Sequence, residues 1–407
     1  MHAFCYATLM KITLKSKAIR AELESPDGTP AFQQLSTDQI VNLSECLLTP
    51  LELPRLSQCV VPGDRICLII DPTTPEVVKL IAEVRQQFLD TITTELDFSL
   101  LLPADTDGSE WNHIIGSLPA DFADKMAIKI HDPEDDQQTV YLASTAGGSR
   151  IYLNPLVVDA DLIITIGTIA WDSSVGLRGT TSGVYPTMSD QKTLLESRRL
   201  GHVELNPADQ NPRREIIDEI GWLIGTQFTV QAIPDDQGNI GQLLCGAPDA
   251  VMAEGRRILM EQRQLHGILD SDLILLSIAP VNDTVSWKDL GHAVALAARL
   301  ANDDTRIAVV ADLPEQISPT LQMLQRCAEP EDLLKPLTLE PTHDALETIQ
   351  LIQALRTSSI FLLSQLPASL VEDLGMLPIE SAAELQRLLS KADRPAVLHG
   401  ANFLAGS

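Results

Sequence analysis

The chain has 407 residues, of which 44% are hydrophobic and 21% charged, as is typical of a globular protein rather than a disordered or fibrous one. This length exceeds what one ordinary core holds, so we expect two domains. Lysine and arginine number 29 against 56 aspartate and glutamate residues, a net charge of −27, and no basic run offsets it. Such a charge repels phosphate backbones and argues against nucleic acid as a partner.

Membrane insertion and secretion are not indicated by the sequence. No apolar run reaches the roughly 18 residues that a membrane span needs. The first residues lack the basic segment and the cleavage site of a signal peptide. The six cysteines form no C-x-x-C pair, and Cys67 and Cys245 lie in strand-like segments, which favours buried, reduced thiols. We therefore expect a cytoplasmic protein without membrane association.

The first two thirds of the chain alternate between strand-like and helix-like segments. Residues 10–24 predict a pair of strands, and Gly63–Ile70 predicts a buried strand. A helical pattern follows, with Thr74 as its predicted N-cap. The most apolar run, Ala160–Ile166, predicts a central strand. Other predicted elements are strands at 96–103, 126–132, 139–144 and 150–154, a helix at 211–225, a hairpin at 228–246 and a helix at 249–267.

The same alternation begins again near Asp270. It predicts strands at 271–279, 305–312, 359–366 and 395–400, and helices at 287–301, 319–329, 345–357 and 381–392. Strict alternation of strand and helix implies a parallel sheet with helices on both faces. We therefore predict an α/β fold with two domains, residues 1–268 and 269–407. Each is expected to be a mainly parallel sheet flanked by helices, with a cleft between the two.

Two loops that follow predicted strands are candidate ligand sites, because open α/β sheets bind ligands at the carboxyl ends of their strands. The first is Asp71–Pro75, which opens a helix and so suits an anion; the alternative is a turn with a helix cap. The second is Gly167–Asp190, which is rich in glycine and hydroxyl groups but matches neither nucleotide-binding fingerprint. Its backbone N–H groups could hold a phosphate or a carboxylate; the alternative is a structural crossover.

The eight histidines of the chain are scattered and predict no metal site by their spacing.

Five landmarks follow one another within residues 55–400, and none of them is diagnostic alone. They are the strand and D-x-T-R-P-like loop at 63–75, the segment at 147–169, the N-P-x-H-like helix with its hairpin at 211–255, and the start and end of the C-terminal domain at 272–313 and 358–400. In this order, the five landmarks make the chain resemble the nickel-pincer lactate racemases.

The resemblance implies a racemase of 2-hydroxy acids that uses a nickel-pincer nucleotide tethered to a lysine, with two histidines as bases. It also places the functional positions of the family on this chain. The catalytic histidine falls at Asp172, the tethering lysine at Ser182 and the nickel-ligand histidine at Arg214. At the remaining positions, Asp71, Thr73 and Pro75 are the same as in the family. Thr74 stands in place of an arginine, and Lys288 and Gly291 stand in place of a glutamine and a lysine.

These replacements predict the loss of the chemistry of the family. An aspartate is a weaker base than imidazole, a serine offers no amine for a tether, and an arginine does not release its proton to bind nickel. We therefore expect no cofactor and a binding or regulatory scaffold for a small anionic ligand. The predicted ligand-binding residues are Thr73, Thr74, Arg178, Thr180, Thr181, Ser182 and Arg214.

The alternative is an enzyme that acts on a small 2-hydroxy acid or another carboxylate in the cleft between the domains, including lactate racemase activity as the family implies. Its candidate catalytic residues are Asp71, Asp172 and Lys288. The sequence leaves open the identity of the ligand, the oligomeric state and the role of the first 50 residues.

Overall fold

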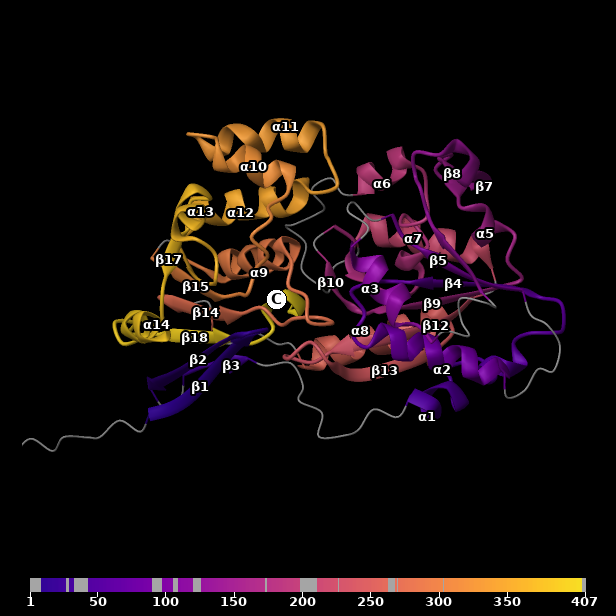
Figure 1. Ribbon diagram of the computed structural model, residues 1–407, viewed down its shortest axis with the longest axis horizontal. Helices are drawn as coiled ribbons and strands as arrows, with labels where there is room; N and C mark the ends of the chain where they lie inside the picture. The colour runs from indigo at the N-terminus through magenta and orange to yellow at the C-terminus, as the bar shows by residue number, and fades with distance from the viewer. Residues whose placement is uncertain are drawn as a thin grey trace, which may run out of the picture.

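The computed structural model describes twelve stretches of the chain, which form two lobes, each built on a six-stranded sheet (Figure 1). The predicted α/β fold with two mainly parallel sheets is confirmed. No helix in these stretches is long and apolar enough to cross a membrane. The described residues are 9–26, 29–32, 43–89, 97–104, 109–119, 126–172, 174–197, 211–225, 227–262, 268, 270–302 and 304–404.

The sheet of the first lobe has the strand order β13-β12-β9-β4-β5-β6. Only the pairing of β12 with β13 is antiparallel, and it forms the predicted hairpin. The apolar run predicted as a central strand is β9, which is buried along its whole length between β4 and β12. The strands are β4 (Arg65–Ile70), β5 (Asp97–Leu102), β6 (Ala127–Ile130), β9 (Leu162–Thr168), β12 (Gln227–Pro234) and β13 (Ile240–Gly246).

Helices cover both faces of this sheet because alternate residues of a strand point to opposite faces. Ile66 and Leu68 of β4 pack against α1, α2 and α3, whereas Cys67 and Ile69 face α5 and α7. The helices are α1 (Leu43–Leu48), α2 (Val77–Leu89), α3 (Ser109–Ser117), α5 (Pro155–Val158), α6 (Gln191–Ser197), α7 (Pro212–Ile224) and α8 (Pro248–Gln262). Two small hairpins complete the lobe, β7 (Val140–Ser144) with β8 (Arg150–Leu153), and β10 (Ala170–Asp172) with β11 (Gly176–Arg178).

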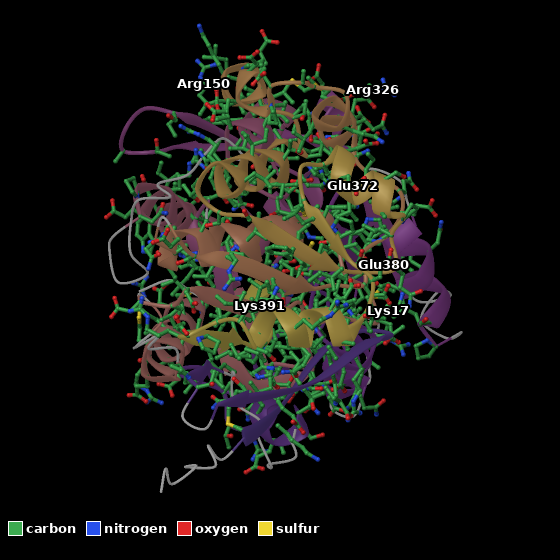
Figure 2. The ribbon with its side chains drawn as sticks, turned by 90° about the vertical axis from the view of Figure 1, so that its left-hand side faces the viewer. Lys17, Arg150, Arg326, Glu372, Glu380 and Lys391 are labelled. Carbon is green, nitrogen blue, oxygen red and sulfur yellow. A yellow bond between two sulfur atoms is a disulfide. The ribbon has the colours of Figure 1, made fainter. Side chains whose placement is uncertain are left out.

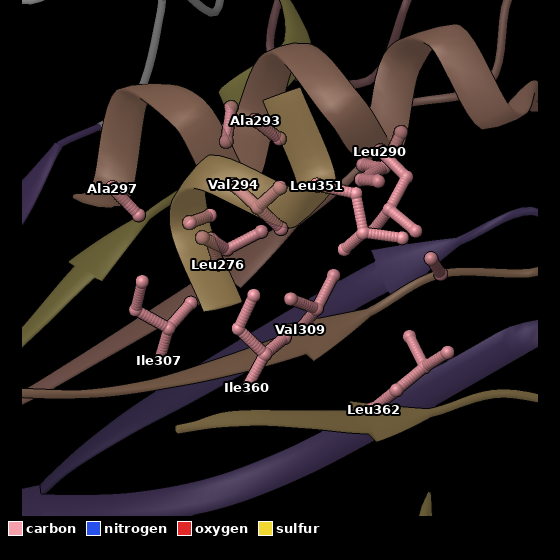
Figure 3. Close-up of a cluster of buried hydrophobic side chains, with 14 of the residues drawn as sticks. Leu276, Leu290, Ala293, Val294, Ala297, Ile307, Val309, Leu351, Ile360 and Leu362 are labelled. Atoms are coloured by element: carbon pink, nitrogen blue, oxygen red, sulfur yellow. The ribbon is translucent and has the colours of Figure 1, made fainter. Parts of the chain in front are cut away.

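The sheet of the second lobe is parallel throughout, with the order β17-β16-β15-β14-β18-β3. Figure 3 shows α9 lying across it, with Leu290, Ala293, Val294 and Ala297 directed at the strands. Its strands are β14 (Leu273–Ser277), β15 (Arg306–Val310), β16 (Ile360–Leu363), β17 (Leu377–Ile379), β18 (Pro395–Leu398) and β3 (Ala31–Phe32). Its helices are α9 (Trp287–Leu300), α10 (Pro319–Gln325), α11 (Leu334–Leu339), α12 (Ala345–Thr357), α13 (Ala368–Asp373) and α14 (Ala382–Leu389).

The N-terminal strands pack with the second lobe, although they precede the first lobe in the sequence. The predicted strand pair is the hairpin of β1 (Leu9–Ser16) and β2 (Ile19–Pro26), whose Leu14 and Leu23 enter a core with Leu275 and Val310. The next strand, β3, pairs with β18 at the edge of the sheet. Figure 2 views this lobe from outside, where charged side chains such as Lys17 and Lys391 lie at the surface. The division of the chain at residue 268 stays a prediction.

The expectation that all cysteines are reduced was wrong for one pair. Cys46 of α1 and Cys245 of β13 form a disulfide although 199 residues separate them. The packing of α1 against β13 brings them together, and no local spacing signals such a contact. Disulfides are rare in the cytoplasm, so the cysteines no longer support the predicted location, which stays a prediction.

Candidate functional site

The loop after β4 folds around the side chain of Asp71. Asp71 Oδ1 accepts hydrogen bonds from Thr73 N at 2.9 Å and from Thr73 Oγ1 at 2.7 Å. The expected cap by Thr74 was wrong, because α2 begins only at Val77 and Thr74 Oγ1 is buried without a hydrogen-bond partner among the described residues. The loop therefore holds its shape through the aspartate.

Arg178, at the end of β11, joins this loop to the glycine-rich one. Its Nη1 donates to Asp71 Oδ2 at 3.1 Å and to Thr73 Oγ1 at 2.7 Å. Its Nε and Nη2 make no hydrogen bond with a described residue. The structure thus brings three predicted site residues together and leaves part of the guanidinium available to a ligand.

Asp172, at the end of β10, is an ionised carboxylate next to this group. Its Oδ1 accepts hydrogen bonds from the backbone N of Ser174 at 2.8 Å and from the Ser174 hydroxyl. Burial raises the pKa of Asp172, but the charge of Lys288, the hydrogen bonds from Ser174 and the charge of Arg178 outweigh burial and lower the pKa to about 2. This carboxylate is therefore negative at neutral pH and is a poor proton acceptor.

Helix α9 brings Lys288 and a histidine from the second lobe to the same place. Lys288 and His292 are four residues apart and so share one face of the helix, opposite the face that packs on the sheet in Figure 3. His292 lies within electrostatic range of Asp172 and Arg178, and its Nε2 is 3.3 Å from the carbonyl O of Leu404. Sequence reasoning missed His292, although its spacing from Lys288 on a predicted helix was a usable signal.

Asn282 fixes how the two lobes meet beside this group. Its Nδ2 donates to the carbonyl O atoms of Thr74 at 2.9 Å and Pro72 at 3.3 Å, and its Oδ1 accepts from Glu76 N at 3.0 Å. An apolar contact among Ala170 of β10 and Ala279 and Phe403 of the second lobe lies in the same junction. We use the name junction site for His292 together with five predicted site residues, namely Asp71, Thr73, Asp172, Arg178 and Lys288.

Arg214 and Thr180 support the glycine-rich loop rather than lining the junction site. The side chain of Arg214 is only 6% exposed. It donates to the carbonyl O atoms of Leu177 and Gly179, to Thr180 Oγ1 and to Asp218 Oδ1 at 2.6–3.2 Å. Its charge therefore orders the loop that carries Arg178.

Thr181 and Ser182 have similar supporting contacts. Ser182 Oγ accepts from Gly179 N at 2.8 Å and donates to the Gly179 carbonyl at 3.1 Å, so it closes the turn of residues 180–183. Thr181 is buried against Gly221 of α7, where a side chain on the glycine would overlap it. Both residues are held by the protein itself.

Metal-binding geometry is absent from the described part of the chain, where no three His, Cys, Asp or Glu residues are grouped to hold an ion. A groove of about 570 Å³ lies at the amino-terminal ends of β15 and β16. It is lined by Arg306, Arg356 and Ser358 among others, and by no residue of the junction site. The junction site lies instead after the carboxyl ends of strands, where α/β folds bind ligands.

Comparison with known proteins agrees with the fold. Residues 9–207 match the family model of the lactate racemase N-terminal domain. The structure is similar to that of the lactate racemase apoprotein from Thermoanaerobacterium thermosaccharolyticum, with a TM-score of 0.76 and 15% identity over 98% of this chain and 100% of that one. A protein from Thermotoga maritima is similar with a TM-score of 0.59 and 13% identity, over 86% of this chain and 96% of that one. No curated protein sequence matches the chain.

Proposed function

The chain belongs to the lactate racemase family, and from this premise we propose that it binds a small carboxylate at the junction site without racemising it through a nickel cofactor. The proposal rests on the identity of the residues at the family's functional positions. Asp172 and Ser182 stand where the resemblance places the catalytic histidine and the tethering lysine, and Arg214 stands at the position of the nickel-ligand histidine.

The contacts of these residues do not fit a nickel-pincer nucleotide. A tether requires an amine, whereas the Ser182 hydroxyl is hydrogen-bonded within its own turn. A nickel ligand requires a free electron pair, whereas Arg214 is a cation that donates to carbonyl and carboxylate oxygens. The residues at these positions have structural roles in this protein. This supports a binding scaffold that does not use the nickel cofactor.

The junction site retains what a small carboxylate needs. Arg178 is oriented by Asp71 and Thr73 and keeps unused N–H groups. Lys288 Nζ makes no ion pair within 4 Å of a described carboxylate. A carboxylate held by both cations gains charge-assisted hydrogen bonds, each worth about 1.5–3 kcal/mol. Asp172 restricts where the ligand carboxylate can lie, because two like charges repel each other.

An enzyme acting on a 2-hydroxy acid or another carboxylate is the second candidate. One observation favours it, namely a histidine in the junction site. Burial lowers the pKa of His292 and outweighs the opposite effects of the Leu404 carbonyl, Asp172 and Asp289, so the imidazole is neutral at pH 7 and able to accept a proton. Turnover of such an acid by the metal-free protein would separate this candidate from simple binding.

The test is co-expression with the enzymes that make the nickel-pincer nucleotide, with an active lactate racemase as positive control. We expect no stoichiometric nickel by elemental analysis, no covalent adduct by intact-protein mass spectrometry, and no loss of optical rotation from L-lactate. Calorimetry should detect lactate binding to the same protein. Stoichiometric nickel with an adduct would overturn the first part of the proposal, and absence of carboxylate binding would overturn the second.

A further inference from the structure

The second lobe has a groove of its own, away from the junction site. Its volume of about 570 Å³ lies within the range of small-molecule sites. The groove is lined by the start of β15 and β16, by the last turn of α12, and by Leu377, the first residue of β17. Leu377 is 44% exposed, and Leu355 of α12 also lines the groove. The groove therefore offers an apolar wall beside the polar residues described next.

Arg306, the first residue of β15, lines the groove with a guanidinium that makes no hydrogen bond to any described residue. Its side chain is only 30% exposed, and its Nη2 lies 3.7 Å from Asp272 Oδ2, too far for a hydrogen bond. The two oxygens of Asp272 instead accept from the backbone N atoms of Asp393 and Arg394, each at 2.9 Å. A largely buried guanidinium without an acceptor is unfavourable, and a ligand with acceptor oxygens would satisfy it.

Ser358, at the C-terminal end of α12, is a second unsatisfied donor in the lining of the groove. It is 8% exposed, and its hydroxyl is buried without a hydrogen-bond partner in the described part of the chain. The pairing of β15 with β16 brings it close to Arg306, because Ile307 N donates to the Ser359 carbonyl O at 3.0 Å. Two polar groups that the described protein leaves unpartnered thus lie at one groove.

Arg356, in the last turn of α12, adds a second cation to the lining. Its Nε lies 3.1 Å from Glu331 Oε1, but the two side chains are 51% and 63% exposed, so this pair is weak. Its Nη1 and Nη2 make no hydrogen bond with a described residue. Asp304 and the carbonyl end of α12 offset part of the positive charge. We therefore expect an anion to be held mainly by directed hydrogen bonds, with modest affinity.

We propose that this groove binds the phosphate group of a small phosphomonoester, whose apolar part lies against Leu355 and Leu377. A phosphate presents three terminal oxygens to the guanidinium groups of Arg306 and Arg356 and to the Ser358 hydroxyl, whereas a carboxylate presents only two. The site shares no residue with the junction site. This inference therefore goes beyond the proposed carboxylate binding, and either of the two can fail without the other.

The experiment uses phenyl phosphate as the probe, because it joins a phosphate that is mostly dianionic at pH 7.5 to an apolar ring. Calorimetry is expected to give a dissociation constant of about 0.1–1 mM. Benzoate and inorganic phosphate should bind at least about threefold more weakly, and phenol should not bind. An excess of lactate should not displace phenyl phosphate, since lactate is expected at the junction site.

Two variants assign the binding to the groove. Arg306→Gln should weaken the binding of phenyl phosphate about tenfold, and Ser358→Ala about threefold. Neither variant should lower stability in urea unfolding, because neither side chain makes a hydrogen bond in the described protein. Arg387→Gln, which removes an exposed arginine of α14 in the same lobe, is the matched control and should leave binding unchanged.

Three results would overturn the inference. They are the absence of phenyl phosphate binding, an affinity for phenol or benzoate equal to that for phenyl phosphate, and unchanged binding in Arg306→Gln or Ser358→Ala. Each of them leaves the proposed function untouched, because that proposal is tested with lactate.

Discussion

Arg178 and Asp71 form an ion pair of 3.1 Å, although 107 residues separate them. Both side chains are largely shielded from water, with 20% and 24% of their surfaces exposed. The pair connects the end of β11 to the end of β4 and uses only one nitrogen of the guanidinium. The pair therefore orients Arg178 and leaves its other nitrogens available. A residue that binds an external carboxylate needs such available N–H groups.

Replacing Arg178 with glutamine is expected to weaken lactate binding by about 10- to 100-fold, because charge-assisted hydrogen bonds to the ligand are lost. Loss of the pair with Asp71 should lower the free energy of unfolding by only about 1 kcal/mol. Calorimetry and urea unfolding measure the two effects. Arg257→Gln, which removes exposed ion pairs on α8, is the control and should leave both unchanged. Equal affinity in Arg178→Gln would contradict the assignment of this residue.

Asn282→Asp should loosen the contact between the lobes. The aspartate retains an acceptor for Glu76 N but loses both donated hydrogen bonds and directs a negative charge at the carbonyl O atoms of Pro72 and Thr74. We expect a loss of about 2 kcal/mol in the free energy of unfolding. Faster hydrogen exchange at the Glu76 amide should accompany it. The neighbouring exposed Asp283 provides the control as Asp283→Asn, and the same effect from both variants would argue against a specific role for Asn282.

The ionised state of Asp172 predicts how stability depends on pH. Its pKa is about 2 in the folded protein against 3.8 for the unperturbed group. A lowered folded-state pKa stabilises the protein above the unfolded pKa, and this stabilisation disappears as the pH falls from about 4 to 2. Asp172→Asn should therefore cost about 2 kcal/mol at pH 7 and almost nothing near pH 2. Urea unfolding of both proteins at the two pH values tests this, and a pH-independent difference would contradict it.

The fold was predictable wherever a local pattern determines it. The apolar run of β9, the strand and helix alternation after Asp270 and the hairpin of β12 and β13 all follow from periodicity and turn residues. The pairing of β3 with β18 depends on a long-range contact of two residues, which no local pattern signals. The disulfide of Cys46 with Cys245 was missed for the same reason.

The candidate site was predictable in its loops but not in the roles of its side chains. Asp71 and Arg178 lie in segments that follow β4 and β9 of the parallel sheet, where α/β topology predicts a ligand site. Whether a polar residue faces a ligand or the protein depends on partners that are distant in sequence. Arg214 and Ser182 belong to residue types that often bind ligands, but both side chains make hydrogen bonds with the backbone of the glycine-rich loop. His292 was overlooked although its spacing of four residues from Lys288 on a predicted helix was a local signal.

The disulfide should contribute to stability by cross-linking two distant parts of the first lobe. It closes a loop of 199 residues between α1 and β13, so its removal frees the unfolded chain. Cys46→Ser is expected to lower the free energy of unfolding by about 2–4 kcal/mol, and reductant should destabilise the unmodified protein by a similar amount without affecting the variant. Cys59→Ser removes a free, half-buried thiol and serves as the control. If alkylation without reductant labels Cys46, or if reductant leaves the unmodified protein unaffected, the bond is not formed in solution.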